Sequence, residues 1–428
     1  MTAIIKNDKK TINAWAMFDW ANSSYALVIS TAIFPPYFIA NTPDVVDFGS
    51  FSLTNSALFS YAVSFSYLLI AILSPILSGI ADYTGKRKFF LKTFTIIGSL
   101  SCMGMWFFAG ESSMWIGTTV FILATIGYSG SIVFYDSYLP IIATEDTMDK
   151  VSAKGFTYGY IGSVILLVFI LSMVLFPSTY GITDERVPAR LGFVLVGLWW
   201  LCFAIVSFIK LPKDQKIIPD ENILSKGYEE ILGVWKELKN MPEIRKFLMA
   251  FFFYSAGVQT VIYLATVFAD KVLNFQTNEM IQIILILQAV AIGGAYFFAW
   301  MSSKVGNKKA LMTMVVMWIG VCIAAHFVYG KGMFYGIAAS VGIVMGGIQA
   351  LSRSTYSKMI NENTDEATSY FSFYDVLYKS SIVVGTFSFG VIDSITGNMR
   401  YSVLALASFF IIGLIILKFT NFKEAFKN

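Results

Sequence analysis

Two oppositely charged residues stand in the middle of an apolar segment near the C-terminal end of the chain. Lys379 lies within the segment 370–392, and Asp375 precedes it by four residues. A charged side chain at the centre of a membrane-spanning helix costs on the order of 3 kcal/mol on insertion scales. Such residues normally face a protein interior or a water-filled path, and by default they mark a substrate or ion pathway. The pair therefore predicts a polar route through a membrane protein, and the alternative is a structural ion pair that sets helix register.

The first apolar segment carries a second group of polar residues. Trp15, Asp19 and Asn22 stand at i, i+4 and i+7 and therefore share one face of a helix. At about 1.5 Å per residue, Asp19 is expected roughly 9 Å inside the start of its helix and Lys379 about 13 Å inside its own. Both are thus expected at or below the bilayer midplane on the cytoplasmic side. The inner headgroup region is the alternative position for Asp19.

Polar residues in three further segments are candidates for the same pathway. Gln349 and Arg353 share a helix face, and Asp136, at the end of another segment, could pair with Arg353. Arg353 is either an anion-binding group or a topology anchor. Gln259, with Tyr254 and Tyr263 nearby, could offer hydrogen bonds to a substrate, and the alternative for the tyrosines is an interface or packing role.

Composition places the chain in a membrane. Its 428 residues are 56% hydrophobic and 14% charged, whereas soluble domains are about 45–50% apolar and about 25% charged. Each of the three cysteines lies alone in an apolar run, which argues against a disulfide framework. No two of them have the spacing of metal ligands, so no metal site is expected. There is no basic patch interleaved with aromatic residues, so no nucleic-acid partner is expected. There is also no phosphate-binding Gly-rich loop with Lys-Ser/Thr, which argues against an ATP-driven pump.

Runs of about 20 apolar residues predict an all-α integral membrane protein with twelve transmembrane helices. The first run is interpreted as a retained span and not a signal peptide, because it is long, contains Asp19 and lacks a small-residue cleavage site. The predicted spans lie near 13–40, 55–80, 89–109, 114–136, 155–176, 189–210, 244–269, 279–302, 310–329, 333–357, 370–393 and 399–420.

The distribution of basic residues predicts the orientation. With both termini in the cytoplasm, the inside segments hold 25 of the 31 lysines and arginines and the outside segments hold five. The remaining one is Lys379. Cytoplasmic loops carry an excess of Lys and Arg, so this orientation is preferred to its reverse.

The spans divide into two sets of six. We expect an N-terminal bundle over 1–210, a cytoplasmic linker over 211–243 and a C-terminal bundle over 244–428. In the linker an apolar stripe predicts an amphipathic helix that lies along the inner membrane surface or packs under the bundle. The stripe consists of Leu224, Tyr228, Ile231, Trp235 and Leu238.

A basic, glycine-containing turn recurs at the same place in both halves, which indicates a parallel internal repeat. The first copy is Gly79-x-x-Asp82-x-x-Gly85-Lys86-Arg87-Lys88, and the second contains Gly306. Glycine permits the tight turn, and the aspartate offers a carboxylate to a helix N-terminus or an arginine. The alternative is an ordinary positive-inside turn. The spacing Gly342-x-x-x-Gly346 further predicts close helix packing within a bundle.

The first of these turns resembles the cytoplasmic signature loop of the major facilitator superfamily. The resemblance implies a gating loop made of Gly79, Asp82, Gly85 and Arg87 that latches the two halves on the cytoplasmic side. It also implies alternating access, in which two six-helix bundles rock about a central site.

Three segments give a closer resemblance. They are Trp15-Ala-Met-Phe-Asp-Trp-Ala-Asn-Ser-Ser-Tyr25, Gly346-Gly-Ile-Gln-Ala-Leu-Ser-Arg-Ser354 and Tyr370-Phe-Ser-Phe-Tyr-Asp-Val-Leu-Tyr-Lys379. Together they resemble a bacterial branch of the superfamily related to the fungal vacuolar effluxers that release amino acids after autophagy. The family often has Gly-Pro after the lysine. Here Val384-Gly385-Thr386 stands instead, so a proline kink is not expected.

We therefore predict a secondary transporter for a small polar or zwitterionic solute in the bacterial inner (plasma) membrane. Amino-acid-like export is implied by the resemblance alone. A lysine and carboxylates out of water can exchange protons as access alternates, so a proton is the expected coupling ion and lipid the expected surroundings. No cofactor and no enzymatic activity are expected. The alternatives are a solute sensor with a transporter-like fold and an integral membrane enzyme acting on lipid, which would need histidine or acidic clusters.

Overall fold

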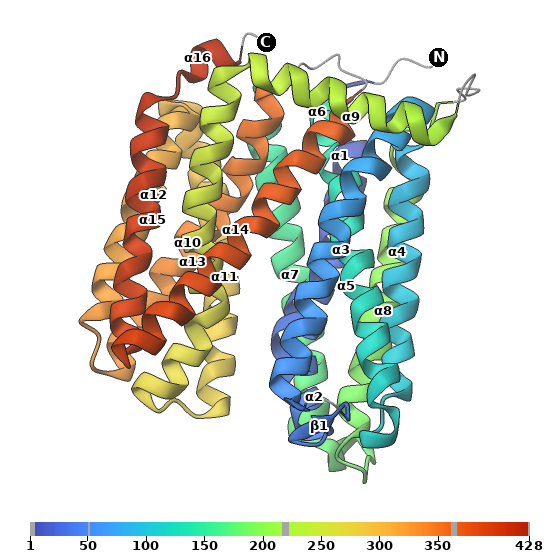
Figure 1. The fold of residues 1–428 in the computed structure, drawn as a ribbon, viewed down its shortest axis with the longest axis vertical. Helices are drawn as coiled ribbons and strands as arrows, with labels where there is room; N and C mark the ends of the chain where they lie inside the picture. Colours follow the sequence, from blue (N-terminus) through green and yellow to red (C-terminus); the bar gives the residue numbers. More distant parts are fainter. Residues whose placement is uncertain (1–4, 50–51, 216–221, 361–365, 427–428) are drawn as a thin grey trace. The chain divides into compact units, whose positions relative to one another are not determined.

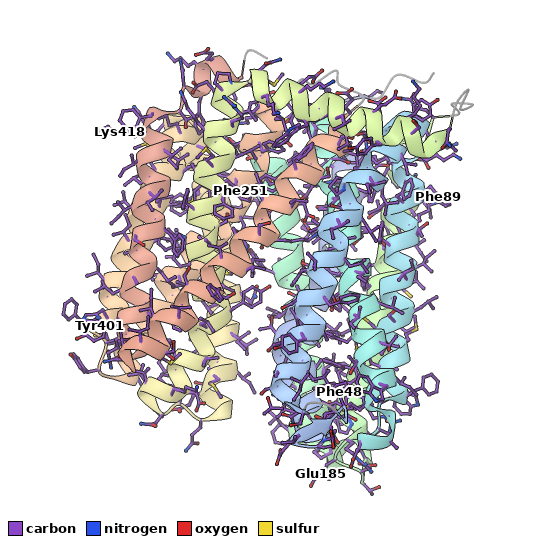
Figure 2. All side chains as sticks on the ribbon, viewed as in Figure 1. Phe48, Phe89, Glu185, Phe251, Tyr401 and Lys418 are labelled. Atoms are coloured by element: carbon purple, nitrogen blue, oxygen red, sulfur yellow. The ribbon has the colours of Figure 1, made fainter. Side chains whose placement is uncertain are left out.

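The protein is almost entirely helical in the computed structural model, which describes residues 5–49, 52–215, 222–360 and 366–426 (Figure 1). Within these residues, twelve helical segments are long and apolar enough to cross a membrane, as predicted. Many large apolar side chains point outward in both halves, among them Phe89 and Tyr401 (Figure 2). Exposed apolar surface of this extent is what a lipid-facing protein requires.

The first six spans are built from α1 (Lys9–Ser24) with η1 (Tyr25–Ile33) and α2 (Phe34–Ala40), α3 (Asn55–Thr84), α4 (Arg87–Gly104), α5 (Met114–Asp136), α7 (Met148–Leu175) and α8 (Val187–Lys210). The second six are α10 (Pro242–Leu273), α11 (Thr277–Val305), α12 (Asn307–His326), α13 (Lys331–Met359), α14 (Ala367–Thr396) and α15 (Met399–Phe419).

Between the spans lie η2 (Met105–Phe107), η3 (Glu111–Ser113), α6 (Leu139–Ile142), η4 (Pro177–Tyr180) and α9 (Ile223–Asn240), and α16 (Phe422–Ala425) follows the last span. Strands β1 (Val45–Asp47) and β2 (Ser52–Thr54) form an antiparallel pair with Val46 opposite Leu53. The linker residues 216–221 and the side chain of Leu224 lie outside the described part of the chain.

Packing groups the chain into two compact units. The N-terminal unit contains Asp8–Asp136 and Tyr158–Tyr228. The C-terminal unit contains Ser137–Thr157 and Glu229–Asn428, together with Met1–Asn7. Helices α7 and α9 each begin in one unit and end in the other.

Helices α11 and α13 approach each other closely in the C-terminal unit. A Cβ atom built on Gly342 would lie 2.7 Å from the Leu287 carbonyl oxygen, and one on Gly346 only 2.1 Å from that of Ala291. The glycine spacing thus marks close packing within a bundle, and that prediction is confirmed.

Two helices begin earlier than the hydrophobic pattern predicts. Helix α1 starts at Lys9 because the Asp8 carboxylate accepts hydrogen bonds from the hydroxyl and the backbone N–H of Thr11. These bonds lower the pKa of Asp8. Helix α14 starts at Ala367. Measured from these ends at about 1.5 Å per residue, Asp19 lies about 15 Å and Lys379 about 18 Å along its helix, farther in than expected.

The first span is not a uniform α-helix. After α1 its backbone runs as the π-helix η1 and then continues as α2. Pro35 and Pro36 follow at the start of α2, and neither can donate a backbone hydrogen bond. Since π-helical segments are frequent at functional sites, this irregularity, which begins three residues after Asn22, supports a special role for the first span.

Candidate transport pathway residues

The predicted charges of α14 form a buried ion pair. Lys379 Nζ donates to Asp375 Oδ2, and the two residues are 5% and 7% exposed. They are held together by helix geometry, because residues four apart lie on one face. A buried pair of this kind loses much of its hydration, and removal of one partner leaves the other charge uncompensated.

Aromatic rings pack the turn of α14 that carries this pair. Phe251 of α10 stacks on Tyr374 with ring centroids 4.2 Å apart and lies 6.2 Å from the ring of Tyr378. Tyr356 of α13 stacks on the same Tyr374 at 5.0 Å. The ion-pair turn is therefore positioned by α10 and α13, the helices that carry the other candidates of this unit.

Helix α14 also packs closely on α10 on the C-terminal side of the ion pair. A Cβ atom on Gly385 would lie 2.3 Å from both the Ala256 carbonyl oxygen and the Thr260 hydroxyl. The helix is continuous through Gly385, in line with the absence of proline from its sequence. Gln259, between Ala256 and Thr260 in the chain, is buried.

Tyr254, considered as a substrate contact, is already bonded within the protein. Its hydroxyl lies 2.8 Å from the Ser352 hydroxyl, and both residues are buried. This bond links α10 to α13.

Arg353 is buried and contacts the start of α7. Its Nε donates to Ser152 Oγ and its Nη2 to the Ser152 carbonyl oxygen, both at 3.0 Å. The guanidinium carbon lies 4.2 Å from the centre of the Phe156 ring, a cation–π distance. Gln349, one turn earlier, is half-buried. The arginine is thus held in a defined orientation, with only 3% of the residue exposed.

In the N-terminal unit the predicted face of the first span is buried as a whole. Tyr135 of α5 donates from its hydroxyl to Asp19 Oδ2 at 2.7 Å, and its carbonyl accepts from Trp15 Nε1 at 3.0 Å. The rings of Trp15 and Tyr135 stack with centroids 4.5 Å apart. Asn22 is 2% exposed, and its Nδ2 has no hydrogen-bond partner among the residues described. Asp136, next to Tyr135, is also buried.

The residues of the predicted gating loop are brought together at the end of α3. Gly79 is buried within this helix, and Gly85 ends it with a φ of +64°. Arg87 pairs with Asp82 at 3.1 Å across the turn. In the second repeat Gly306 ends α11 with a φ of +85°. Both glycines thus adopt positive φ, which other residues rarely do.

A residue that the sequence did not single out fastens this loop to the linker. Asp214 accepts from the backbone N–H groups of Lys88 and Phe89, at 2.6 and 2.9 Å, at the start of α4. Lys88 Nζ donates to the Leu211 carbonyl oxygen at 2.7 Å. The carboxylate serves as a helix cap from a distant part of the chain, which no local pattern predicts.

The structure reveals two further residues of interest that local patterns missed. Tyr135 contacts Asp19 from 116 residues away. Asp149 forms an ion pair with Lys358 across 209 residues. Tyr135 stands at the end of the apolar segment 114–136, whereas Asp149 stands in the polar segment before the next span, so neither position indicates its distant partner.

The described residues offer no cluster suited to a metal ion. Within 5–49, 52–215, 222–360 and 366–426, no three His, Cys, Asp or Glu side chains are placed to bind one. Acidic side chains of the candidate site pair instead with lysine, arginine or tyrosine, as at Asp375, Asp82 and Asp19.

Comparison with known proteins gives a consistent result. Residues 7–428 match the family described as "Vacuole effluxer Atg22 like". The MFS-type transporter YxiO of Bacillus subtilis is 30% identical, over 97% of this chain and 96% of that protein. Autophagy-related protein 22 of Saccharomyces cerevisiae is 25% identical, over 83% of this chain and 75% of that protein.

Among solved structures, the chain resembles that of FucP, a major facilitator superfamily transporter, with a TM-score of 0.72. The alignment covers 96% of this chain and 98% of FucP at 15% identity. At this identity the likeness concerns the fold alone. It confirms the predicted all-α major facilitator fold of twelve spans.

Proposed function

This chain belongs to the Atg22-like family of vacuole effluxers, within the major facilitator superfamily, and from that membership we propose that it is a secondary transporter of a small polar or zwitterionic solute. Amino-acid-like export is the specific activity that we propose. Relatives and fold are those of transporters, so an enzyme acting on lipid is not proposed.

The observation that carries the proposal is the buried Asp375–Lys379 pair in α14. Two charges buried in a membrane span are costly to retain, and residues of this kind usually serve substrate or ion passage. We propose that Lys379 faces the transported solute and that Asp375 holds it in place. Asp19, Asn22, Asp136, Gln259, Gln349 and Arg353 are proposed as further pathway residues.

Proton coupling is part of the proposal. A buried carboxylate–lysine pair can release and take up a proton when its surroundings change from dry to wet. FucP, which shares the fold, is a fucose:proton symporter. We therefore expect flux through this protein to respond to an imposed pH gradient and to lose that response with a protonophore.

For placement in the cell, we propose the bacterial plasma membrane with both termini in the cytoplasm. The excess of 25 basic residues inside over five outside supports this orientation. We also propose that 1–210 and 244–428 act as the two moving bundles, that 211–243 joins them, and that the Asp82 loop serves as a cytoplasmic gate.

The test begins with a thermal-shift screen of amino acids and related zwitterions on the purified protein. Each ligand that raises the unfolding temperature is then assayed for uptake into liposomes. We expect Lys379→Met to abolish flux while the protein still folds. Asp375→Asn should destabilise the protein more, because it leaves a buried cation without its partner.

A matched control is Lys331→Met, which removes the same charge from the ion pair of Lys331 with Glu279. Those side chains are 41% and 25% exposed, so flux should persist. Normal flux in the Asp375→Asn, Lys379→Met double variant would reduce the pair to a structural role. Ligand binding without flux in the unaltered protein would identify a sensor and refute transport.

A further inference from the structure

Helix α9, in the linker, has two apolar faces. One is buried against the protein and consists of Ile231, Val234 and Leu238. The other remains exposed and consists of Tyr228, Leu232 and Trp235, which are 56%, 37% and 48% exposed. These three stand at i, i+4 and i+7 and form one continuous stripe, which we term the α9 outer stripe. Packing within the protein therefore accounts for only part of this helix's apolar surface.

The end of α9 lies at the level where a span begins. Only Met241 separates the last residue of α9, Asn240, from Pro242, the first of α10. Met249, seven residues into α10, is 56% exposed on a membrane-spanning helix. At about 1.5 Å per residue this distance is about 10 Å. The C-terminal half of α9 therefore lies close to the edge of the lipid.

Contacts with α14 fix the same half of α9 in place. Tyr370 donates from its hydroxyl to the Glu237 carboxylate, and Phe373 stacks on Trp235 with ring centroids 5.7 Å apart. Both partners are in the first turns of the span Ala367–Thr396. In Figure 1, α9 runs across the ends of α10 and α14. A helix held across the ends of two spans is expected at the depth of lipid headgroups.

Two lysines lie beside the C-terminal half of the outer stripe, and the exposed Glu229 lies beside its start. Lys236 and Lys239 are exposed, and Lys239 Nζ lies 5.4 Å from the centre of the Trp235 ring. The acidic residue between them, Glu237, is bonded to Tyr370. Tryptophan and tyrosine favour the membrane–water interface, and lysines there attract anionic headgroups.

From this combination we propose that the α9 outer stripe binds the membrane interface and that Lys236 and Lys239 select anionic lipid headgroups. The proposal does not depend on the identity of the transported solute. Because α9 is bonded to the helix that carries Asp375 and Lys379, lipid held by α9 also restrains the start of α14.

The test uses the full chain in lipid nanodiscs with an environment-sensitive fluorophore on a single cysteine. Cys202 is exposed and is changed to serine, whereas Cys102 and Cys322 are buried and stay. The probe is placed at Leu232→Cys. The matched control is Gly233→Cys, where a side chain would meet nothing within 4 Å and points about 100° away around the helix.

We expect blue-shifted emission and several-fold stronger quenching by spin-labelled lipid at position 232 than at 233. The shift should be larger in nanodiscs of phosphatidylcholine with phosphatidylglycerol than in phosphatidylcholine alone. The Lys236→Gln, Lys239→Gln double variant should remove that difference. Equal shifts in both compositions would overturn the selection of anionic lipid. Water-like emission at 232 in both would overturn the lipid surface and leave a soluble protein as its occupant.

Discussion

The Asp149 carboxylate accepts hydrogen bonds from four other side chains of the C-terminal unit, and its removal gives a quantitative test of the packing. Asp149 is buried at the start of α7, in the part of this helix that belongs to the C-terminal unit. Its oxygens accept hydrogen bonds from Ser302 Oγ at 2.9 Å, Asn307 Nδ2 at 2.9 Å, Ser354 Oγ at 2.7 Å and Lys358 Nζ at 2.8 Å. One carboxylate thus ties α7 to the ends of α11, α12 and α13.

The magnitude follows from burial. The side chains of Lys358 and Asp149 are only 7% and 8% exposed, so solvent screens their attraction weakly. Removing one partner of a buried ion pair costs about 3–5 kcal/mol. After Asp149→Ala, Lys358 Nζ still has the Asn307 side-chain oxygen at 2.9 Å. We therefore expect the lower end of the range, about 3 kcal/mol of unfolding free energy.

The double variant Asp149→Ala, Lys358→Met should recover most of this loss, because no buried charge is left without its partner. Unfolding free energies are measured by denaturant titration in detergent micelles. Where unfolding is irreversible, thermal midpoints at one scan rate are compared instead. Lys331→Met, at an exposed ion pair, is the control and should cost at most about 1 kcal/mol. A double variant no more stable than Asp149→Ala would refute the ion-pair reasoning.

Three further predictions follow from other parts of the molecule. For orientation, a single cysteine that replaces Asp44 should react with an impermeant reagent added outside, and one that replaces Lys150 should not. The opposite labelling pattern would show that the assigned orientation is wrong. For the gating loop, Asp82→Asn weakens the pairing with Arg87 and should slow transport while leaving folded yield and ligand binding intact, so unchanged turnover in liposomes would exclude the latch role. For helix packing, Gly346→Ala should lower the unfolding midpoint because its Cβ would lie 2.1 Å from a carbonyl oxygen. The control Gly320→Ala, whose Cβ would meet nothing within 4 Å, should be neutral or stabilising by up to about 1 kcal/mol. Similar midpoints for the two variants would contradict the close approach of α11 and α13.

The sequence by itself determined the features that depend on neighbouring residues. Apolar run length predicted twelve spans because a bilayer core requires about 20 residues per helix. The pairing of Asp375 with Lys379 was predictable because one helical turn brings residues four apart together, whatever surrounds the helix. The turns at Gly85 and Gly306 were predictable because few other residues adopt positive φ.

Tertiary structure alone decided which polar groups meet across the fold. Tyr135 reaches Asp19 and Lys358 reaches Asp149 over separations of 116 and 209 residues, and such contacts depend on how helices pack, not on any local spacing. The distances of Asp19 and Lys379 from the starts of their helices were underestimated, because helix starts depend on capping and packing, which hydropathy does not measure. The exposure of the α9 outer stripe is likewise decided by packing. An apolar stripe is visible in the sequence, but only packing decides which part of it the protein covers.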